Sequence, residues 1–126
     1  MHGMHARLPK NFVLEERLER YAAVIELEPA ALAGRWAEAS APLGEKPFRE
    51  VRLDVGCGKG AFLVASAQAE PDVLFIGLDA EPVCVAYASQ HIMEAGLRNA
   101  LIVPAKGSDV ARIFAAGELA GMTINF

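Results

Sequence analysis

Residues 51–60 have the sequence Val51-Arg-Leu-Asp-Val-Gly-Cys-Gly-Lys-Gly60, an apolar run that leads into three alternating glycines. An amphipathic segment follows over 61–69. A buried strand, a tight glycine turn and a helix N-terminus in this order are typical of the place where an α/β sheet binds a nucleotide-like cofactor. Asp54, two residues before the first glycine, favours S-adenosylmethionine (SAM) over a pyrophosphate, because the amino group and the sulfonium of SAM are cationic.

Strand and helix patterns alternate downstream of this stretch. Apolar strands are expected over 51–55, 73–78, 100–103 and 122–126, and helices over 60–69, 82–95 and 109–116. Strands that are apolar throughout and alternate with helices predict an α/β fold, a parallel sheet covered on both faces. We therefore expect about four strands of a doubly wound, Rossmann-like sheet.

The first 47 residues have a different character from the rest of the chain. Residues 1–10 contain cations but no acids, which predicts a flexible basic arm. Apolar residues recur at helical spacing over 14–27, a second helical stretch is expected over 29–39, and proline and glycine predict a linker over 40–47. The expected division is thus an N-terminal extension over 1–47 and a cofactor-binding domain over 48–126.

Composition restricts the class of protein. The 126 residues are 53% hydrophobic and 22% charged, which suits a folded domain, and the formal net charge of −4 provides no global basic field for nucleic acid. Two cysteines predict free thiols in a reducing compartment. No apolar run reaches membrane-spanning length and no signal peptide is recognisable, so we expect a cytoplasmic protein without membrane contact.

The glycines and Asp79 carry the expected cofactor chemistry. Glycine lets the backbone turn sharply and lets a ligand approach without a Cβ in the way, and the helix N-terminus that follows can bind a carboxylate. Asp79 ends the second strand 21 residues after Gly58, close to the interval at which an acid binds ribose hydroxyls. An ordinary strand-to-helix turn is the alternative for the glycines, and a helix N-cap is the alternative for Asp79.

A nicotinamide cofactor is a competing hypothesis, because Gly56 to Ala61 also fit the G-x-G-x-x-A pattern. Asp54 and the third glycine at position 60 argue against it. Cys57 has no His or Cys at ligand spacing, so no metal site is expected. Lys59 is either a solvated turn cation or a contact to RNA phosphate, and His91 is expected to be a helix-face residue.

Several segments together resemble the bacterial tRNA (guanine-N7-)-methyltransferases. The resemblance rests on Leu53-Asp-Val-Gly-Cys-Gly-Lys-Gly-Ala-Phe-Leu63, Pro71-Asp-Val-Leu-Phe-Ile-Gly-Leu-Asp79, Glu94-Ala-Gly-Leu-Arg-Asn99, Lys10-Asn-Phe-Val-Leu-Glu-Glu-Arg-Leu-Glu19, Gly34-Arg-Trp36 and Thr123-Ile-Asn-Phe126. It implies a Rossmann-like, SAM-dependent fold and methylation of N7 of a guanosine in tRNA. It also implies a cofactor site at Asp54, Gly56, Cys57, Gly58, Gly60, Asp79, Ala80, Lys106 and Gly107.

Two departures from the family pattern bear on activity. Lys106 stands where the family has an acid that contacts adenine, and Ser108 or Asp109 are the candidates to replace it. The family's Asp-Pro-Trp segment, which carries the expected catalytic Asp, would begin just past Phe126. The catalytic residue is therefore unknown, and we expect weak or absent catalysis from this chain.

The last residues, 123–126, are expected to lie within the fourth strand. An open strand edge is a hazard that complete domains manage, so the chain is expected to be a C-terminally truncated cofactor-binding half. The same edge could pair with a second subunit. The alternatives to a methyltransferase are a non-catalytic SAM- or RNA-binding module and an NAD-dependent oxidoreductase fragment.

Overall fold

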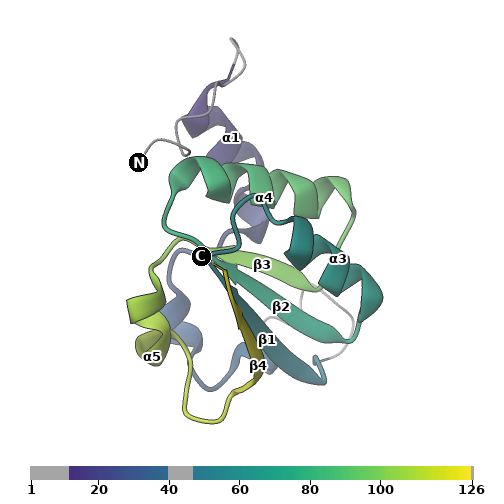
Figure 1. Ribbon diagram of the computed structural model, residues 1–126, viewed down its shortest axis with the longest axis vertical. Helices are drawn as coiled ribbons and strands as arrows, with labels where there is room; N and C mark the ends of the chain where they lie inside the picture. The colour runs from purple at the N-terminus through teal and green to yellow at the C-terminus, as the bar shows by residue number, and fades with distance from the viewer. Residues whose placement is uncertain (1–11, 40–46, 126) are drawn as a thin grey trace.

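The computed structural model describes residues 12–39 and 47–125 and contains a four-stranded parallel sheet (Figure 1). The strand order is β3-β2-β1-β4, and each neighbouring pair is parallel. The strands are β1 (Glu50–Val55), β2 (Val73–Leu78), β3 (Ala100–Val103) and β4 (Leu119–Ile124). This arrangement confirms the predicted α/β fold.

The connections between strands place helices on the sheet. Helix α3 (Ala61–Ala69) joins β1 to β2, and α4 (Pro82–Glu94) joins β2 to β3. Each of these two connections leads to the next strand on the same side, from β1 to β2 and from β2 to β3. Because such connections are right-handed, both helices lie on one face of the sheet. Figure 1 shows them side by side there. The return from β3 to β4 runs the other way through η5 (Gly107–Asp109) and α5 (Val110–Ile113).

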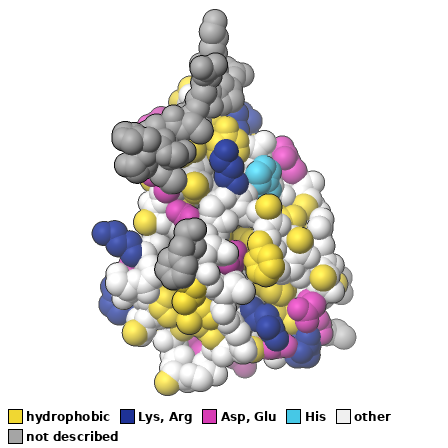
Figure 2. All heavy atoms as spheres, in the orientation of Figure 1, with side chains coloured by type: hydrophobic (Ala, Val, Ile, Leu, Met, Phe, Trp, Pro, Cys, Tyr) yellow, Lys and Arg dark blue, Asp and Glu magenta, His cyan; other side chains and the backbone are white. Residues whose placement is uncertain are grey.

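The central strands form the core of the molecule. Every residue of β2 and β3 is buried, as their continuous apolar sequences predict. Strand β4 differs, because Met122 and Ile124 are 51% and 53% exposed. Phe62 on α3 is also 57% exposed, and Figure 2 shows hydrophobic side chains on this face of the molecule. The sheet is thus well covered at its centre and open at β4.

The N-terminal segment packs first on α4 and the β3 edge of the sheet, and then on α5 and β1. It contains α1 (Leu14–Arg20), η2 (Ala22–Val24), η3 (Pro29–Leu32) and α2 (Trp36–Ala39). The prediction of one helix over 14–27 is wrong, because the chain becomes extended at Ile25 and forms a parallel bridge to Ile102. The Glu26 amide donates a hydrogen bond of 2.8 Å to the Ile102 carbonyl, which satisfies a backbone group at the edge of β3.

Two later boundaries also differ from those expected. The helix predicted over 109–116 ends at Ile113, because Phe114 is extended and packs on Trp36 with ring centroids 5.4 Å apart. The indole N–H of Trp36 donates to the Ile113 carbonyl at 2.9 Å, which holds this chain reversal. Strand β4 begins at Leu119, three residues before the predicted start.

The expected basic arm over 1–10 and most of the expected linker lie outside the described residues. Within the described ranges, none of the helices has the length and apolar character needed to cross a bilayer.

Candidate functional site

The predicted site residues meet at the carboxyl edge of the sheet. Asp54 is the last residue but one of β1, Asp79 directly follows β2, and Lys106 follows β3 by three residues. Because the strands are parallel, their carboxyl ends lie along one edge, the usual ligand-binding edge of an open α/β sheet. The glycine turn between β1 and α3 lies at the same edge.

The three glycines of the turn have positive φ angles and different surroundings. A Cβ on Gly60 would lie 3.0 Å from the Ala88 Cβ, and one on Gly56 would lie 2.7 Å from the Asn125 carbonyl oxygen. These two glycines therefore allow parts of the protein to pack closely. Gly58, with φ +57°, has no atom of another described residue, its chain neighbours aside, within 4 Å of its Cβ position. Its open side is where a ligand can approach the backbone.

Asp79 connects the glycine turn to the start of α4. Its Oδ2 accepts a hydrogen bond from the Gly58 amide and its Oδ1 accepts one from the Glu81 amide, each at 2.9 Å. The N-cap of α4 is Glu81, whose side chain accepts from the Val83 amide at 3.2 Å. Asp79 is therefore not the N-cap. Each of its carboxylate oxygens has a further lone pair with which to accept a hydroxyl.

Asp54 is buried, with 3% of its surface exposed, and only one of its carboxylate oxygens has partners. Oδ1 accepts hydrogen bonds from the Thr123 hydroxyl at 2.9 Å and from the Asn125 amide at 2.5 Å. Oδ2 is buried without a hydrogen-bond partner among the described residues. Burial raises the pKa of Asp54, and the two hydrogen bonds from β4 and its end oppose this rise.

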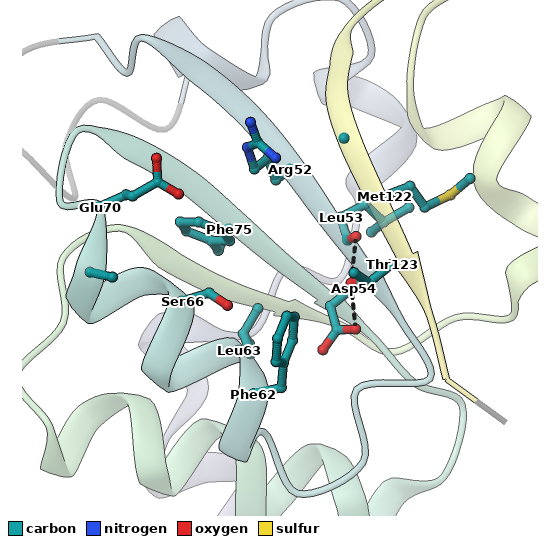
Figure 3. Close-up of a pocket in the computed structure, with 12 residues that line it drawn as sticks. Arg52, Leu53, Asp54, Phe62, Leu63, Ser66, Glu70, Phe75, Met122 and Thr123 are labelled. Atoms are coloured by element: carbon teal, nitrogen blue, oxygen red, sulfur yellow. Dashed lines mark hydrogen bonds between the residues drawn. The ribbon is translucent and has the colours of Figure 1, made fainter.

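A cavity of about 300 Å³ lies beside Asp54, between α3 and strands β1 and β4 (Figure 3). Phe62, Leu63, Ser66 and Met122 contribute to its walls. A buried carboxylate oxygen without a donor is energetically costly, so this position suits a cationic N–H donor such as an ammonium group. The residues present thus fit the amino group of a bound amino acid moiety.

Thr123 and Asn125 are site residues that sequence reasoning missed. The signal for them is the parallel register, which pairs Asp54 with Thr123. That register can be known only once β4 is placed beside β1 instead of beside β3. The only sign in the sequence of these hydrogen bonds to Asp54 is that positions 123 and 125, at the end of an otherwise apolar strand, are polar.

A second and larger cavity, of about 870 Å³, lies at the carboxyl ends of β2 and β3. Ala80, Lys106, Ser108 and Asp109 line one side of it, and residues 27–31 of the N-terminal segment line the other. Sequence reasoning did not foresee that second wall. The predicted ligand residues Ala80 and Lys106 therefore share a cavity, and Gly107 begins the short η5 helix next to them.

Asp109 provides an acid in this cavity although position 106 is a lysine. Its Oδ2 accepts a hydrogen bond from the Lys106 amide at 3.1 Å and its Oδ1 accepts one from Arg112 at 2.6 Å. Arg112 and then the Lys106 amide lower the pKa of this carboxyl group, which keeps it ionised. The structure thus places the Asp109 carboxylate in the same cavity as Lys106, and contact with adenine stays a prediction.

Cys57 and His91 are held by packing and by hydrogen bonding within the protein. The Cys57 side chain is buried, and burial foremost raises the pKa of its thiol, so it could contact a ligand only through its backbone. His91 Nδ1 lies 2.7 Å from the Lys59 carbonyl oxygen, which joins α4 to the glycine turn. In the part of the chain that the structure describes, no group of three His, Cys, Asp or Glu residues is arranged to hold a metal ion.

A parallel sheet with a glycine turn and two carboxylates at its carboxyl edge is typical of α/β proteins that bind nucleotide-like cofactors. Residues 49–126 match the family model described as "Putative methyltransferase". The chain belongs to this methyltransferase family.

Similar curated proteins include three streptococcal proteins named tRNA (guanine-N(7)-)-methyltransferase. Those of Streptococcus thermophilus (strain CNRZ 1066) and Streptococcus equi subsp. zooepidemicus (strain H70) are each 32% identical over 120 residues, and that of Streptococcus agalactiae serotype III (strain NEM316) is 31% identical. Each match covers 95% of this chain and 54% of the relative. The chain thus spans about half the length of these curated relatives.

Solved structures give the same fold. The antibiotic-resistance methyltransferase Kmr is 33% identical with a TM-score of 0.57, over 71% of this chain and 47% of that one. The aminoglycoside resistance methyltransferase NpmB1 is 28% identical with a TM-score of 0.54, over 80% and 46% of the two chains. Both similarities confirm the predicted Rossmann-like methyltransferase fold.

Proposed function

We propose that this chain is the cofactor-binding half of a SAM-dependent methyltransferase that acts on N7 of a guanosine in tRNA. The observation that carries the proposal is the buried Oδ2 of Asp54, which has no partner among the described residues, in a chain similar to tRNA (guanine-N(7)-)-methyltransferases over 95% of its length. The proposed site of action is the cytoplasm.

Different site residues are proposed to bind the methionine moiety, the ribose and the adenine of the cofactor. Asp54 accepts a hydrogen bond from the amino group of the methionine moiety, and the backbone at Gly56, Gly58 and Gly60 lines that moiety. Asp79 accepts hydrogen bonds from the ribose hydroxyls. Ala80, the backbone at Lys106 and the Asp109 carboxylate surround the adenine in the larger cavity, and Gly107 lies next to them in the sequence.

Bound SAM supplies a methyl group on a cationic sulfur, which makes that carbon electrophilic. Guanine N7 has an in-plane lone pair and no proton to remove, so the reaction needs no strong general base. The chain's task in this scheme is to hold and orient the donor, the contribution expected when catalysis depends mainly on positioning. We assign no catalytic residue within the described part of the chain.

Calorimetric titration of the chain with SAM, with its demethylated product S-adenosylhomocysteine and with NAD tests the proposal. We expect saturable binding of the first two ligands and none of NAD. Binding of NAD alone would support an oxidoreductase instead. If none of the three ligands binds, the proposal that this chain holds the cofactor is wrong.

A further inference from the structure

Aromatic rings and cations form a cluster on α4 beside the glycine turn. The ring centroids of Phe12 and Tyr87 lie 5.5 Å apart, and those of Tyr87 and His91 lie 6.3 Å apart. The Arg17 guanidinium carbon lies 4.5 Å from the Phe12 centroid and 5.8 Å from the Tyr87 centroid. Lys59 Nζ lies 4.9 Å from the Tyr87 centroid. We call these five residues the aromatic-cationic patch.

The cations of the patch are positioned by uncharged groups. Arg17 donates a hydrogen bond of 2.8 Å to the side-chain oxygen of Gln90. Among the described residues, neither Arg17 nor Lys59 forms an ion pair with a carboxylate, whereas Arg49, Arg52 and Arg112 do. A cation held against aromatic rings and not neutralised by an acid keeps its capacity to bind an anion.

The patch begins at the proposed methyl-donor site. Lys59 lies within the glycine turn, between Gly58 and Gly60, and its carbonyl oxygen contacts His91 on α4. His91 is half-buried, and its ring centroid lies 6.3 Å from that of Tyr87, the ring over which Lys59 Nζ lies. An anion bound by the patch would therefore lie next to the donor.

We propose that the aromatic-cationic patch binds the phosphate backbone of the RNA substrate, with Arg17 and Lys59 contacting phosphates and the rings holding both cations in place. This inference rests on the proposed function, which makes the substrate an RNA. The chain has a formal net charge of −4 and α1 carries three exposed glutamates, so RNA affinity must come from a local cluster and not from a global field. Arginine and aromatic side chains in combination are typical of RNA-binding surfaces.

Fluorescence anisotropy with an unmodified tRNA transcript, titrated with the 126-residue chain at several salt concentrations, tests the patch. The test variants are Lys59→Gln, at an exposed position, and the double variant Arg17→Gln with Lys59→Gln. The matched control, Arg35→Gln with Arg49→Gln, removes the same charge from the other end of the sheet, where both residues line a separate cavity.

We expect the double patch variant to bind tRNA about tenfold or more weakly. We also expect the slope of log affinity against log salt to fall by about 0.7–0.9 for each phosphate that the variant no longer neutralises. The control should bind like the wild type. Equal affinities and slopes for patch and control variants would overturn the proposal. Loss of binding to anionic phospholipid vesicles with unchanged tRNA binding would identify a membrane surface as the occupant and also overturn it.

The SAM titration of the wild-type chain separates this inference from the proposed function. If SAM binds but tRNA affinity does not depend on Arg17 and Lys59, the patch proposal is wrong and the proposed cofactor role stands. If SAM does not bind, the proposed function fails whatever the RNA titrations show. Thermal unfolding of Lys59→Gln, expected to match the wild type, shows that any loss of tRNA binding by this variant is not a loss of fold.

Discussion

Asp54 shows how one residue combines a cost in stability with a binding function. Its carboxylate is buried and its pKa is raised, so the unfolded chain ionises more readily than the folded one. The stability contribution of such a group is fully present below the unfolded pKa and is lost as pH rises through the folded pKa. A cationic ligand group at Oδ2 would offset this cost, which is why we assign the methionine amino group to this atom.

The Asp54→Asn substitution tests this assignment. It should raise the unfolding temperature of the ligand-free chain at about pH 7, because the buried charge is removed, and the difference should shrink towards about pH 4. SAM affinity should fall about tenfold or more, because a hydrogen bond to a charged group contributes about 1.5–3 kcal/mol. Calorimetry and thermal unfolding at both pH values measure these effects.

Asp72→Asn is the matched control, since Asp72 is exposed and its carboxyl pKa is lowered, first by the hydrogen bond from Arg49. It should leave SAM affinity unchanged. An Asp54→Asn chain that binds SAM as tightly as the wild type would contradict the role given to Oδ2.

Two glycines of the same turn should respond differently to alanine. Gly60→Ala combines a positive φ with a Cβ 3.0 Å from that of Ala88, so we expect a loss of about 2–4 kcal/mol in the free energy of unfolding. Among the described residues, the methyl group of Gly58→Ala meets no atom beyond its chain neighbours, so this variant should lose only about 1–2 kcal/mol. Its methyl group would point into the proposed ligand space, however, and should weaken SAM binding more than that loss of stability would suggest.

Urea unfolding and SAM titration of the two alanine variants distinguish these effects. If Gly58→Ala kept full SAM affinity, the open side of Gly58 would not be the ligand side. If Gly60→Ala were as stable as the wild type, the close approach of α3 and α4 would tolerate a methyl group there.

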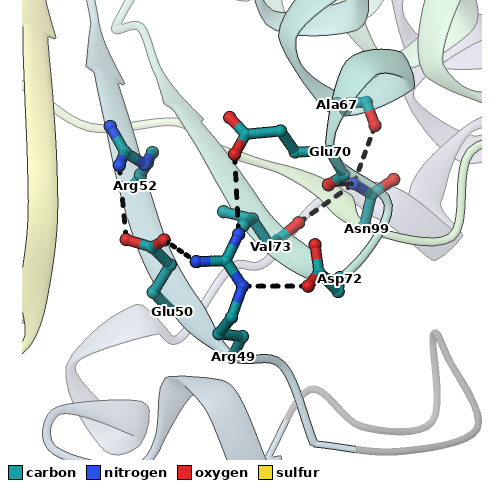
Figure 4. Close-up of polar contacts among 8 residues, drawn as sticks. All are labelled: Arg49, Glu50, Arg52, Ala67, Glu70, Asp72, Val73 and Asn99. Carbon is teal, nitrogen blue, oxygen red and sulfur yellow. Dashed lines mark hydrogen bonds and ion pairs between the residues drawn. The ribbon is translucent and has the colours of Figure 1, made fainter.

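Among the secondary structure elements, the end of α3 depends on the side chain of Asn99, the residue that directly precedes β3. The side-chain amide of Asn99, which is 4% exposed, donates to the carbonyl oxygens of Ala67, Glu70 and Val73 at 2.9–3.0 Å (Figure 4). These carbonyls belong to the last turn of α3, the turn that follows it and the start of β2. One amide thus fixes the angle between a helix and the next strand.

Removing this donor should destabilise the fold without touching the cofactor site. Asn99→Ala leaves buried carbonyls unpaired, so we expect a loss of about 1–3 kcal/mol in the free energy of unfolding. Asn99→Asp has the same shape but places a carboxylate against the carbonyl oxygens, and it should be more destabilising still. Chemical denaturation provides the measurement, and a smaller effect of Asp than of Ala would show that the donor function of Asn99 is not what stabilises this corner.

For the molecule as a whole, the open feature is the edge at β4. Strand β4 pairs only with β1 among the described strands, and its side chains are mostly exposed. Unpaired strand edges with apolar side chains favour association with another strand. Association of two copies of this chain through β4 therefore stays a prediction.

Sedimentation velocity tests this association. The wild-type chain should form dimers at high concentration, and Ile124→Lys should shift the population to monomer, because a charge would be placed at the paired edge. Val13→Lys, which changes another exposed apolar residue directly before α1 and outside the sheet, is the control and should not alter the distribution. A wild-type chain that stays monomeric at all concentrations would contradict the prediction.

Local patterns in the sequence were sufficient for the sheet elements and for most candidate site residues. Apolar runs predicted β2 and β3 because both are buried on both faces, and the α4 boundaries followed from Pro82 at its start and Gly96, with φ +66°, after its end. Asp54, Asp79 and the three glycines could be named in advance because each stands at a strand end next to a turn. The division at residue 47 and the ligand roles of these residues stay predictions.

The remaining features depended on contacts between segments far apart in the chain. Ile25 is extended because the edge of β3 is beside it, and α5 ends early because Phe114 packs on Trp36. Neither contact produces a hydrophobic repeat in the neighbouring sequence from which it could be predicted. The partners of Asp54 on β4, the position of Asp109 beside Lys106, and the aromatic-cationic patch have the same origin. Hydrophobic periodicity reports which residues are buried, whereas hydrogen-bond partners are set by strand order and packing.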